Sequence, residues 1–307
     1  MVEKFKREGR ANNELRPMEA KAGIIPNAAG SAYFKIGKTA AYATVYGPRS
    51  LYPKFKQDPE KGLLRCHYNM MPFSGTGNRV RPGQNRRAKE ISLVTENALK
   101  SVLAFEDFPN SVVDVFIEIP AADAGTRCAG ICAASIALAD AGFAMKEMVA
   151  AISVGKVNDT VIVDLDYNEE AWDGEVADIP VAMQPTTGEV SLLQMDGIIS
   201  KEQLAEALSM AQEACQRINE VQKAALYEKY SKVESEVAEK FPETFNQNNS
   251  DEDEVSESND SANQEPSEKA ASSEDSDSGK DASEDTSKNT TEGAKADVPK
   301  SKKGEEK

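Results

Sequence analysis

Histidine is almost absent from this sequence, and cysteine is scarce. The chain of 307 residues has one histidine, His67, and four cysteines, none of them spaced as Cys-x-x-Cys. A structural zinc site needs about four cysteine or histidine ligands close together, so the sequence argues against this class of site. We expect the cysteines to be reduced and to fill the core, and we expect no catalytic role for His67, since no motif surrounds it.

Long apolar segments are also missing. No run of apolar residues is long enough to span a bilayer, and the charged start, MVEKFKREGR, does not resemble a signal peptide. We therefore expect a cytoplasmic protein with no membrane partner.

Basic residues are outnumbered by acidic ones, and most of the imbalance lies near the C-terminus. The formal net charge is −16, and residues 250–307 contribute −10 of it through 18 acidic residues and 8 lysines, with no aromatic residue. Such a segment buries too little apolar surface to offset its ordering entropy. We predict a folded domain at 1–249, with its core at about 7–230, and a disordered acidic tail at 250–307. Because the folded part carries only −6, a nucleic-acid partner is not excluded.

The apolar patterning predicts a mixed fold. Helical periodicity indicates helices over about 86–103, from 126 to a C-cap at Gly142, and over about 200–230. Strand patterns occur at 31–46, which reads as a hairpin turning at Gly37, and at 63–69, 111–119, 150–157, 160–167, 178–185 and 189–197. Helices and strands do not alternate one for one, which predicts an α+β fold with helices packed on mixed β-sheets.

The first candidate site is AADAGTR, which directly precedes the helix at 126. A helix N-terminus presents unpaired N–H groups and the positive end of the macrodipole, so it attracts phosphate. Gly125 lets a ligand approach the backbone, Thr126 supplies a hydroxyl, and Arg127 can bind two phosphate oxygens. The alternative is a capped helix with a surface arginine.

The second candidate is RVRPGQNRRAKE, a basic cluster in an acidic protein. Arg86 and Arg87 fall in the first turn of the helix at 86–103, where cations oppose the dipole. A bound polyanion such as RNA explains that placement, whereas the alternative is a solvated helix start. The cluster comprises Arg79, Arg81, Arg86, Arg87 and Lys89.

The third candidate is DLDYNEEAWDGEVADIP at 164–180, which is rich in carboxylates. Paired carboxylates can hold Mg²⁺ or act as a general acid. Most such runs are solvated loops, but Asp178 opens an apolar strand, a position that fixes a side chain better than a loop does.

These segments together resemble the RNase PH family, most closely the catalytic RNase PH-type subunit of the archaeal exosome. The resemblance extends over about residues 7–230, and its most specific parts are RRAKEIS and AADAGTR. Further matching segments are ELRPMEAKAG, NAAGSAYFKIGKT, VYGPR, LRCHYNMMPFS, VDLDYNEE, DIPVAM and LLQMDG.

The resemblance implies an RNase PH fold, related to the second domain of a small-subunit ribosomal protein. It also implies a hexameric ring of three heterodimers with an inactive RNase PH-type paralogue, under a trimeric cap of RNA-binding proteins. The implied reaction is 3′-to-5′ shortening of RNA, with inorganic phosphate as co-substrate and Mg²⁺ as cofactor. It releases nucleoside diphosphates, and its reverse adds heteropolymeric tails.

The resemblance assigns roles to the candidate residues. Gly125, Thr126 and Arg127 would bind the attacking phosphate, and Arg86 and Arg87 would hold the RNA backbone. Asp178 would act on the leaving oxygen, as a Mg²⁺ ligand or as a proton donor.

Two further assignments are implied by the resemblance. Arg65 and Tyr68 match a loop that faces the channel and touches RNA. Tyr68 would stack on a base there, and the alternative is a half-buried strand tyrosine. Active members of the family carry two aspartates six residues apart, but here Trp172 stands six before Asp178. The acidic partner of Asp178 is therefore Asp173 or Glu170.

Two other functions remain open at this point. The chain could be a ring subunit that binds RNA without cutting it, although such members typically lose the acidic residue or the arginines, and both are present here. It could also be a homohexameric RNase PH that trims tRNA, which would be active without a paralogue.

Overall fold

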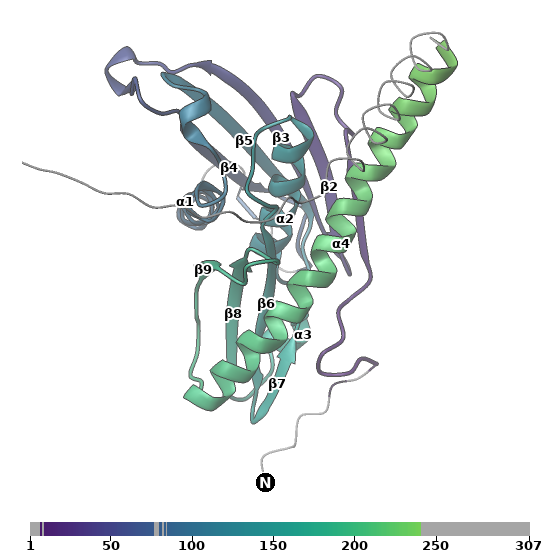
Figure 1. Cartoon of the computed structure of the whole chain (residues 1–307). Coiled ribbons are helices and arrows are strands. Elements are labelled where there is room, and N and C mark those ends of the chain that lie inside the picture. The colour runs from purple at the N-terminus through teal and green to yellow at the C-terminus, as the bar shows by residue number, and fades with distance from the viewer. Residues whose placement is uncertain (1–6, 8, 77–79, 82, 84, 241–307) are drawn as a thin grey trace, which may run out of the picture. The chain divides into compact units, whose positions relative to one another are not determined.

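The computed structural model describes residues 7, 9–76, 80, 81, 83 and 85–240, drawn in colour in Figure 1. The predicted acidic tail at 250–307 lies outside these residues, as does Arg79 of the basic cluster. No helix in the described ranges is long and apolar enough to cross a membrane.

The N-terminal half of the folded part builds a five-stranded sheet. Its strand order is β1-β2-β3-β5-β4, in which β4 and β5 are parallel and the other neighbours are antiparallel. The predicted hairpin is present, with its turn at Gly37, where φ is +58°. The strands are β1 (Met18–Ala22), β2 (Gly30–Ile36), β3 (Thr39–Ser50), β4 (Leu63–Met70) and β5 (Ser111–Ala121).

A second, four-stranded sheet follows in the chain. It is antiparallel throughout, with the order β7-β6-β8-β9. The register between β6 and β8 places Ser153 opposite Pro180 and Gly155 opposite Asp178. The strands are β6 (Ala150–Val157), β7 (Thr160–Val163), β8 (Val176–Met183) and β9 (Val190–Leu193).

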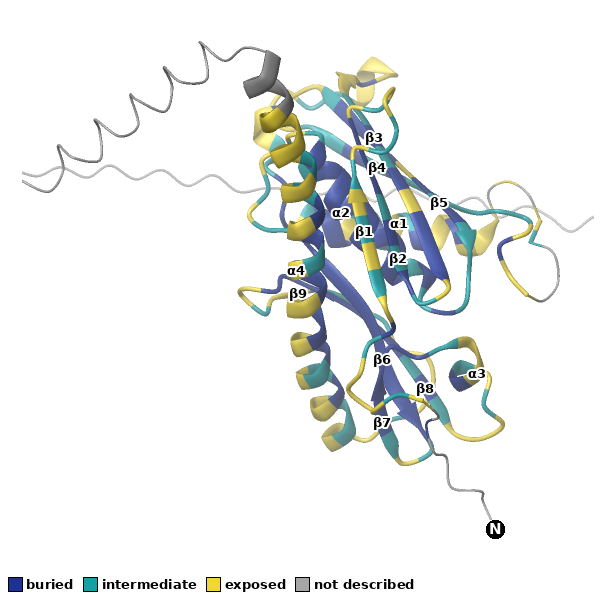
Figure 2. Ribbon diagram, turned by 90° about the vertical axis from the view of Figure 1, so that its right-hand side faces the viewer, coloured by how far each residue is buried: buried dark blue, intermediate teal, exposed yellow. Residues whose placement is uncertain are grey.

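Helix α2 packs against both sheets and is almost wholly buried. Helix α2 contacts β2, β3 and β5 of the first sheet and β6 and β8 of the second, and Figure 2 shows it as an almost wholly buried segment. Helix α1 packs on β4, and α4 packs on β6, β7 and β1. The helices are α1 (Arg86–Lys100), α2 (Thr126–Asp140), α3 (Tyr167–Glu170) and α4 (Lys201–Lys240), with short 3-10 turns η1 (Lys54–Lys56) and η2 (Phe105–Asp107).

The small side chains of α2 explain how it fits between the sheets. A Cβ atom at Gly130 would lie 3.1 Å from Cγ2 of Ile117, which is closer than ordinary van der Waals contact. Cys128 and Cys132 are buried on the same helix, and all four cysteines are buried and free, as predicted. The close packing fixes the N-terminus of α2 relative to strands of both sheets.

The α+β fold class is confirmed, but several boundaries differ from the predictions. β7 ends at Val163, four residues early, because Asp164 adopts a left-handed conformation with φ of +58°. β5 continues through Pro120 to Ala121, at a point where the register with β3 shifts, so this proline is accommodated at an irregularity. β1 was not predicted, and α4 extends to Lys240 rather than to about 230.

The predicted acidic loop at 164–180 contains a helical turn, α3. The side chain of Asp166 accepts a hydrogen bond from the backbone N–H of Glu169, and the Glu169 carboxylate accepts one from the backbone N–H of Asp166, forming a capping box. This reciprocal capping converts part of a charged loop into a fixed element.

Candidate active site

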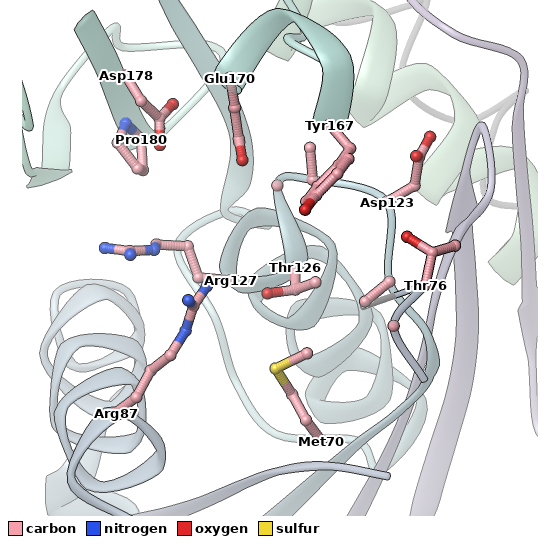
Figure 3. Close-up of a pocket in the computed structure, with 14 residues that line it drawn as sticks. Met70, Thr76, Arg87, Asp123, Thr126, Arg127, Tyr167, Glu170, Asp178 and Pro180 are labelled. Carbon is pink, nitrogen blue, oxygen red and sulfur yellow. The ribbon is translucent and has the colours of Figure 1, made fainter. Parts of the chain in front are cut away.

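Members of all three predicted groups, the phosphate-binding, RNA-binding and carboxylate residues, meet in one pocket of about 250 Å³. Figure 3 shows Glu170 and Asp178 above Arg127 and Arg87, with Thr126 to the right of Arg127. The lining residues are Met70, Gly75, Thr76, Arg87, Ala122, Asp123, Ala124, Gly125, Thr126, Arg127, Tyr167, Glu170, Asp178 and Pro180.

The N-terminus of α2 opens into this pocket. Its N-cap residue, Gly125, is left-handed with φ of +64° and has no side chain to accept hydrogen bonds from the first turn. The helix dipole and these amides therefore favour an anion at this end. The hydroxyl of Tyr68 donates to Oγ1 of Thr126 at 2.8 Å, and Nη1 of Arg127 donates to Oε1 of Gln194.

Two contacts fix the loop before α2. The Thr39 hydroxyl donates to the carbonyl of Ala124 at 2.7 Å and accepts from the backbone N–H of Asp123 at 3.0 Å. Ala124 has a φ of +125°, which is unusual for a residue with a side chain. Thr39 thus holds a strained turn in place beside the pocket.

Asp178 is held from two directions. The Ser153 hydroxyl donates to Oδ1 of Asp178. The backbone of Asp178 pairs with that of Asp196, with N–O distances of 2.8 Å and 2.9 Å. Burial raises the pKa of the Asp178 carboxyl, while the Ser153 hydrogen bond opposes that shift.

Glu170 has an unusual pKa for a carboxyl. Burial raises it to about 7, and the neighbouring charge of Asp178 contributes, while Arg16, Arg87 and the backbone of Gly125 oppose the rise. Two carboxyls of raised pKa in one cavity are typical of an active site.

The structure distinguishes between the two candidate partners of Asp178. Glu170 shares the pocket with it, because α3 directs this side chain inward. Asp173 lies in an exposed turn after α3 and does not line the pocket. Glu170 is therefore the candidate partner that the structure brings to Asp178, and Asp173 is the one that it does not.

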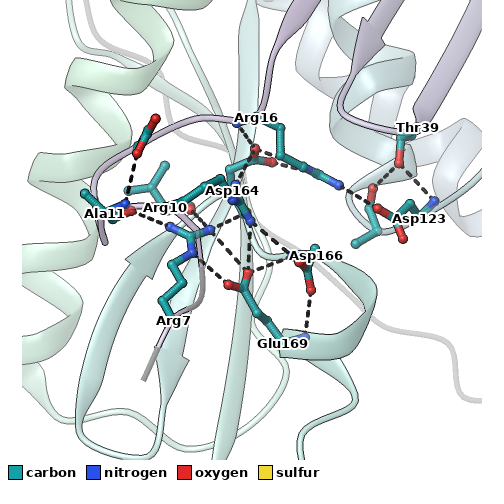
Figure 4. A network of polar contacts seen from close by, with 12 residues as sticks. Arg7, Arg10, Ala11, Arg16, Thr39, Asp123, Asp164, Asp166 and Glu169 are labelled. Atoms are coloured by element: carbon teal, nitrogen blue, oxygen red, sulfur yellow. Dashed lines mark hydrogen bonds and ion pairs between the residues drawn. The ribbon is translucent and has the colours of Figure 1, made fainter. Parts of the chain in front are cut away.

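A buried network of ion pairs anchors α3 to the N-terminal segment (Figure 4). Arg7 Nε lies 2.7 Å from Glu169 Oε1, and Arg16 Nη2 lies 2.6 Å from Asp164 Oδ1. Arg16 Nη1 also lies 3.6 Å from a carboxylate oxygen of Asp123. Arg16 thus connects the turn before α3 with the loop before α2.

The predicted RNA-binding residues separate into two groups. Arg86 and Arg87 are both exposed, but only Arg87 lines the pocket. Arg65 is also outside, with its guanidinium bound to Asp114 through Nε–Oδ1 and Nη2–Oδ2 contacts of 2.7 Å and 2.9 Å.

Tyr68 requires a correction. Its side chain is only 1% exposed and packs in the core beneath α2. The ring has no free face for a base, so the prediction that it stacks on RNA is wrong for this structure. Its hydroxyl instead supports Thr126.

Several residues of the site were missed by reasoning from the sequence. Tyr167 and Thr76 line the pocket, and Ser153 and Gln194 hold residues that line it. Gln194 lies in the segment LLQMDG, which had been singled out without a role. Ser153 had no sequence signal, since its position depends on the register between β6 and β8.

The carboxylates suit a magnesium ion. Mg²⁺ in proteins is commonly held by one or two carboxylates together with substrate phosphates. Glu170 and Asp178 provide two such groups beside the predicted phosphate site. Within the described residues no cluster of three or more acidic, cysteine or histidine side chains offers a fuller ligand set.

Comparison with known proteins gives the family. The description "3′ exoribonuclease family, domain 1" matches residues 14–144, and "domain 2" matches 147–214. The chain belongs to the 3′ exoribonuclease family. Its pocket combines Arg87 and the N-terminus of α2 from the first family domain with Glu170 and Asp178 from the second.

Similar members of the 3′ exoribonuclease family come from archaea. The exosome complex component Rrp41 of Pyrococcus furiosus is 48% identical over 230 residues, which cover 75% of this chain and 91% of that protein. Rrp41 of Methanopyrus kandleri is 45% identical over 223 residues, 73% of this chain and 92% of that protein. The predicted resemblance to the RNase PH-type subunits of the archaeal exosome is thereby confirmed.

Solved structures confirm the fold. The crystal structure of rice (Oryza sativa) Rrp46 matches with a TM-score of 0.63 at 25% identity, covering 71% of this chain and 98% of that one. A structure of the Archaeoglobus fulgidus exosome with RNA bound to the active site matches with a TM-score of 0.60 at 19% identity, covering 69% and 90%.

Proposed function

We propose that this chain is the catalytic RNase PH-type subunit of an archaeal exosome. It shortens RNA from the 3′ end by phosphorolysis and releases nucleoside diphosphates, and the reverse reaction adds heteropolymeric tails. The observation that carries the proposal is the meeting, in one pocket, of an uncapped helix N-terminus, two arginines and two carboxylates.

Inorganic phosphate is the nucleophile in this proposal. The amides at the N-terminus of α2 and the Thr126 hydroxyl bind it, and Arg127 adds a guanidinium with several donors. Holding phosphate in a fixed orientation makes its attack on the RNA effectively unimolecular.

RNA enters the same pocket with its last backbone phosphate near Arg87. An oxygen of inorganic phosphate attacks the phosphorus of the terminal nucleotide, and the bond from that phosphorus to the preceding 3′ oxygen breaks. The products are a nucleoside diphosphate and an RNA shorter by one residue. No covalent enzyme intermediate is needed, consistent with a pocket that presents neither cysteine nor histidine.

The departing 3′ oxygen must be stabilised and protonated. Asp178 and Glu170 line the pocket and are the groups proposed for this, and they would hold a Mg²⁺ ion. Such an ion supplies Lewis-acid stabilisation of the leaving oxygen. Ser153 and the Asp196 backbone hold Asp178 in position for this role.

The partners follow from the relatives, which are named as exosome components. We propose a hexameric ring of three heterodimers with an inactive paralogue, capped by three RNA-binding proteins and working in the cytoplasm. We also propose that residues 1–249 form the catalytic unit. The second candidate, an RNA-binding ring subunit without activity, is disfavoured because the arginines and both carboxylates line the pocket.

The decisive experiment uses the ring reconstituted with its paralogue, an oligoribonucleotide, phosphate and Mg²⁺. We expect nucleoside diphosphate release from the wild type, its loss in Asp178→Asn with RNA binding retained, and near-normal release in Asp173→Asn. Asp173 provides a matched control because its carboxylate is exposed and outside the pocket. No release from an assembled wild-type ring would favour the non-catalytic subunit. Full activity of the chain without the paralogue would favour the homohexameric enzyme that trims tRNA.

A further inference from the structure

The segment LLQMDG at 192–197 follows β9 and borders the active site, yet the proposed mechanism gives it no part. Gln194 is its most connected residue. Its Oε1 accepts a hydrogen bond from Nη1 of Arg127, and its Nε2 lies 3.4 Å from Oε1 of Glu90 on α1. Its backbone N–H donates to the carbonyl of Pro180 at 3.1 Å. Gln194 therefore links the helix that carries Arg127, the helix that carries Arg87, and the strand that carries Asp178.

The rest of the segment keeps Gln194 in this place. Asp196 pairs through its backbone with Asp178. Gly197 has φ of +105°, and a Cβ atom there would lie 2.3 Å from the carbonyl oxygen of Val176. The segment therefore lies so close to β8 that a residue with a side chain would not fit at position 197. This close contact fixes the backbone from which the Gln194 side chain extends.

The acceptor that Gln194 offers to Arg127 is neutral. Other arginines near the site are compensated by carboxylates, such as Arg16 by Asp164 and Arg7 by Glu169. Among the residues that the structure describes, no ion pair joins Arg127 to a carboxylate within 4.0 Å. An amide oxygen orients a guanidinium without cancelling its charge, whereas a carboxylate does both.

We propose that Gln194 is a positioning residue that orients Arg127 for inorganic phosphate while leaving the arginine's charge available to that anion. The inference rests on the proposed function, since it concerns the phosphate site of the same reaction. A glutamine can orient the guanidinium of Arg127 without compensating its positive charge, and other residue types lose one of these two properties. Glutamate at this position would keep an acceptor but compensate the cation, and methionine would remove the acceptor with little change in size.

The experiment compares Gln194→Glu and Gln194→Met with the wild type in the reconstituted ring. The KM for phosphate and the KM for RNA are measured separately. The rise in melting temperature of each ring with increasing phosphate concentration reports phosphate binding without turnover. Gln203→Glu is the matched control, because it adds the same charge at the start of α4, away from the pocket.

We expect Gln194→Glu to raise the KM for phosphate about tenfold or more, the effect of removing one charge-assisted contact, with the KM for RNA changed less than about twofold. Gln194→Met should raise the KM for phosphate by a smaller factor, and Gln203→Glu should leave it unchanged. The phosphate-dependent thermal shift should be weakened in the same order.

Several results would overturn the inference. One is an unchanged KM for phosphate in Gln194→Glu, and another is an equal rise of both KM values, which would indicate general distortion of the pocket. If the Gln194→Glu ring does not assemble, the test rests on Gln194→Met. A KM for phosphate in that variant equal to the wild-type value would contradict the positioning role. Absence of turnover in the wild type would refute the proposed function, whereas the thermal shifts would still show whether Gln194 controls phosphate binding.

Discussion

Arg16 and Asp164 form a buried ion pair through two nitrogen–oxygen contacts, Nη2–Oδ1 at 2.6 Å and Nε–Oδ2 at 2.9 Å. The backbone N–H of Arg16 donates a third hydrogen bond to the same carboxylate, at 2.7 Å. The Asp164 side chain is only 1% exposed, and Arg16 is its main charged partner, with Nη1 of Arg10 at 3.3 Å as a second. The pair joins the segment before β1 to the turn that leads into α3.

Removing one member of this pair should strongly destabilise the fold. Arg16→Met leaves the buried Asp164 carboxylate with only Arg10, whose Nη1 lies 3.3 Å from Oδ2, as a charged partner, and we expect a loss of about 3 kcal/mol in the free energy of unfolding. The measurement is urea denaturation. Lys232→Met is the control, since Lys232 and Glu228 form an exposed ion pair, which contributes little to stability. Similar losses in both variants would contradict the importance of the buried pair.

The raised pKa of Glu170 predicts a pH dependence of stability. Its value of about 7 in the folded protein lies above the ordinary 4.5, so the folded state binds a proton more tightly than the unfolded chain does. Stability should therefore fall as pH rises from about 4.5 to 7 and should not recover above pH 7.

Glu170→Gln tests this directly. In EDTA, the variant should be more stable than the wild type at pH 8, by about 1 kcal/mol after discounting for the partial solvent exposure of the carboxyl. At pH 4 the two proteins should differ little. Wild-type and variant unfolding curves with the same pH dependence would show that Glu170 titrates normally.

The two neighbouring arginines at the start of α1 should contribute unequally to RNA binding. Arg87→Glu should weaken binding more than Arg86→Glu, because only Arg87 lines the pocket. The double variant should be weakest. Each lost phosphate contact should reduce the slope of log affinity against log salt by about 0.7 for single-stranded RNA. Equal affinities of wild type and double variant at moderate salt would remove both residues from the RNA path.

Replacing Tyr68 tests whether this residue supports the proposed phosphate site or contacts RNA. Tyr68→Phe removes the hydrogen bond to Thr126 and should lower the free energy of unfolding by about 1 kcal/mol. RNA affinity, measured by fluorescence anisotropy without phosphate, should stay at the wild-type value, since the ring is buried. A large loss of RNA affinity at unchanged stability would restore the stacking role.

The acidic tail should be dispensable for catalysis. A chain ending at Asn249 loses a formal charge of −10 but keeps every residue of the pocket. We expect its reconstituted ring to release nucleoside diphosphates at the wild-type rate in a single-turnover assay. Loss of activity in an assembled ring would show that the tail takes part in the reaction.

The main elements of the fold could be predicted because their patterns are local. Alternation predicted the β2–β3 hairpin, β4 and β6, and apolar spacing predicted α1. The glycine, threonine and arginine at 125–127 were recognisable because a helix start has a short-range signature. The predicted ends of elements were wrong where the backbone conformation of a single residue decided them, as at Asp164, whose φ is positive.

The side chains that hold the catalytic groups could not be predicted in the same way. Ser153 reaches Asp178 only because β6 and β8 pair in one particular register, and Gln194 reaches Arg127 across 67 positions of sequence. Tyr68 was misassigned for a related reason. Its place in an alternating strand does not say whether a helix covers that face, and here α2 does.

The sequence alone determined the family, the fold class and the positions of the candidate phosphate-binding turn, the arginines and Asp178, since these depend on residue type and short spacing. Only the tertiary structure decided which carboxylate joins Asp178, that Tyr68 is internal, and that Gln194 and the Arg16–Asp164 pair hold the site together. The physical reason is that hydrogen bonds and ion pairs depend on distances of a few ångströms. Those distances between remote segments are set by sheet register and by the packing of α2 against both sheets.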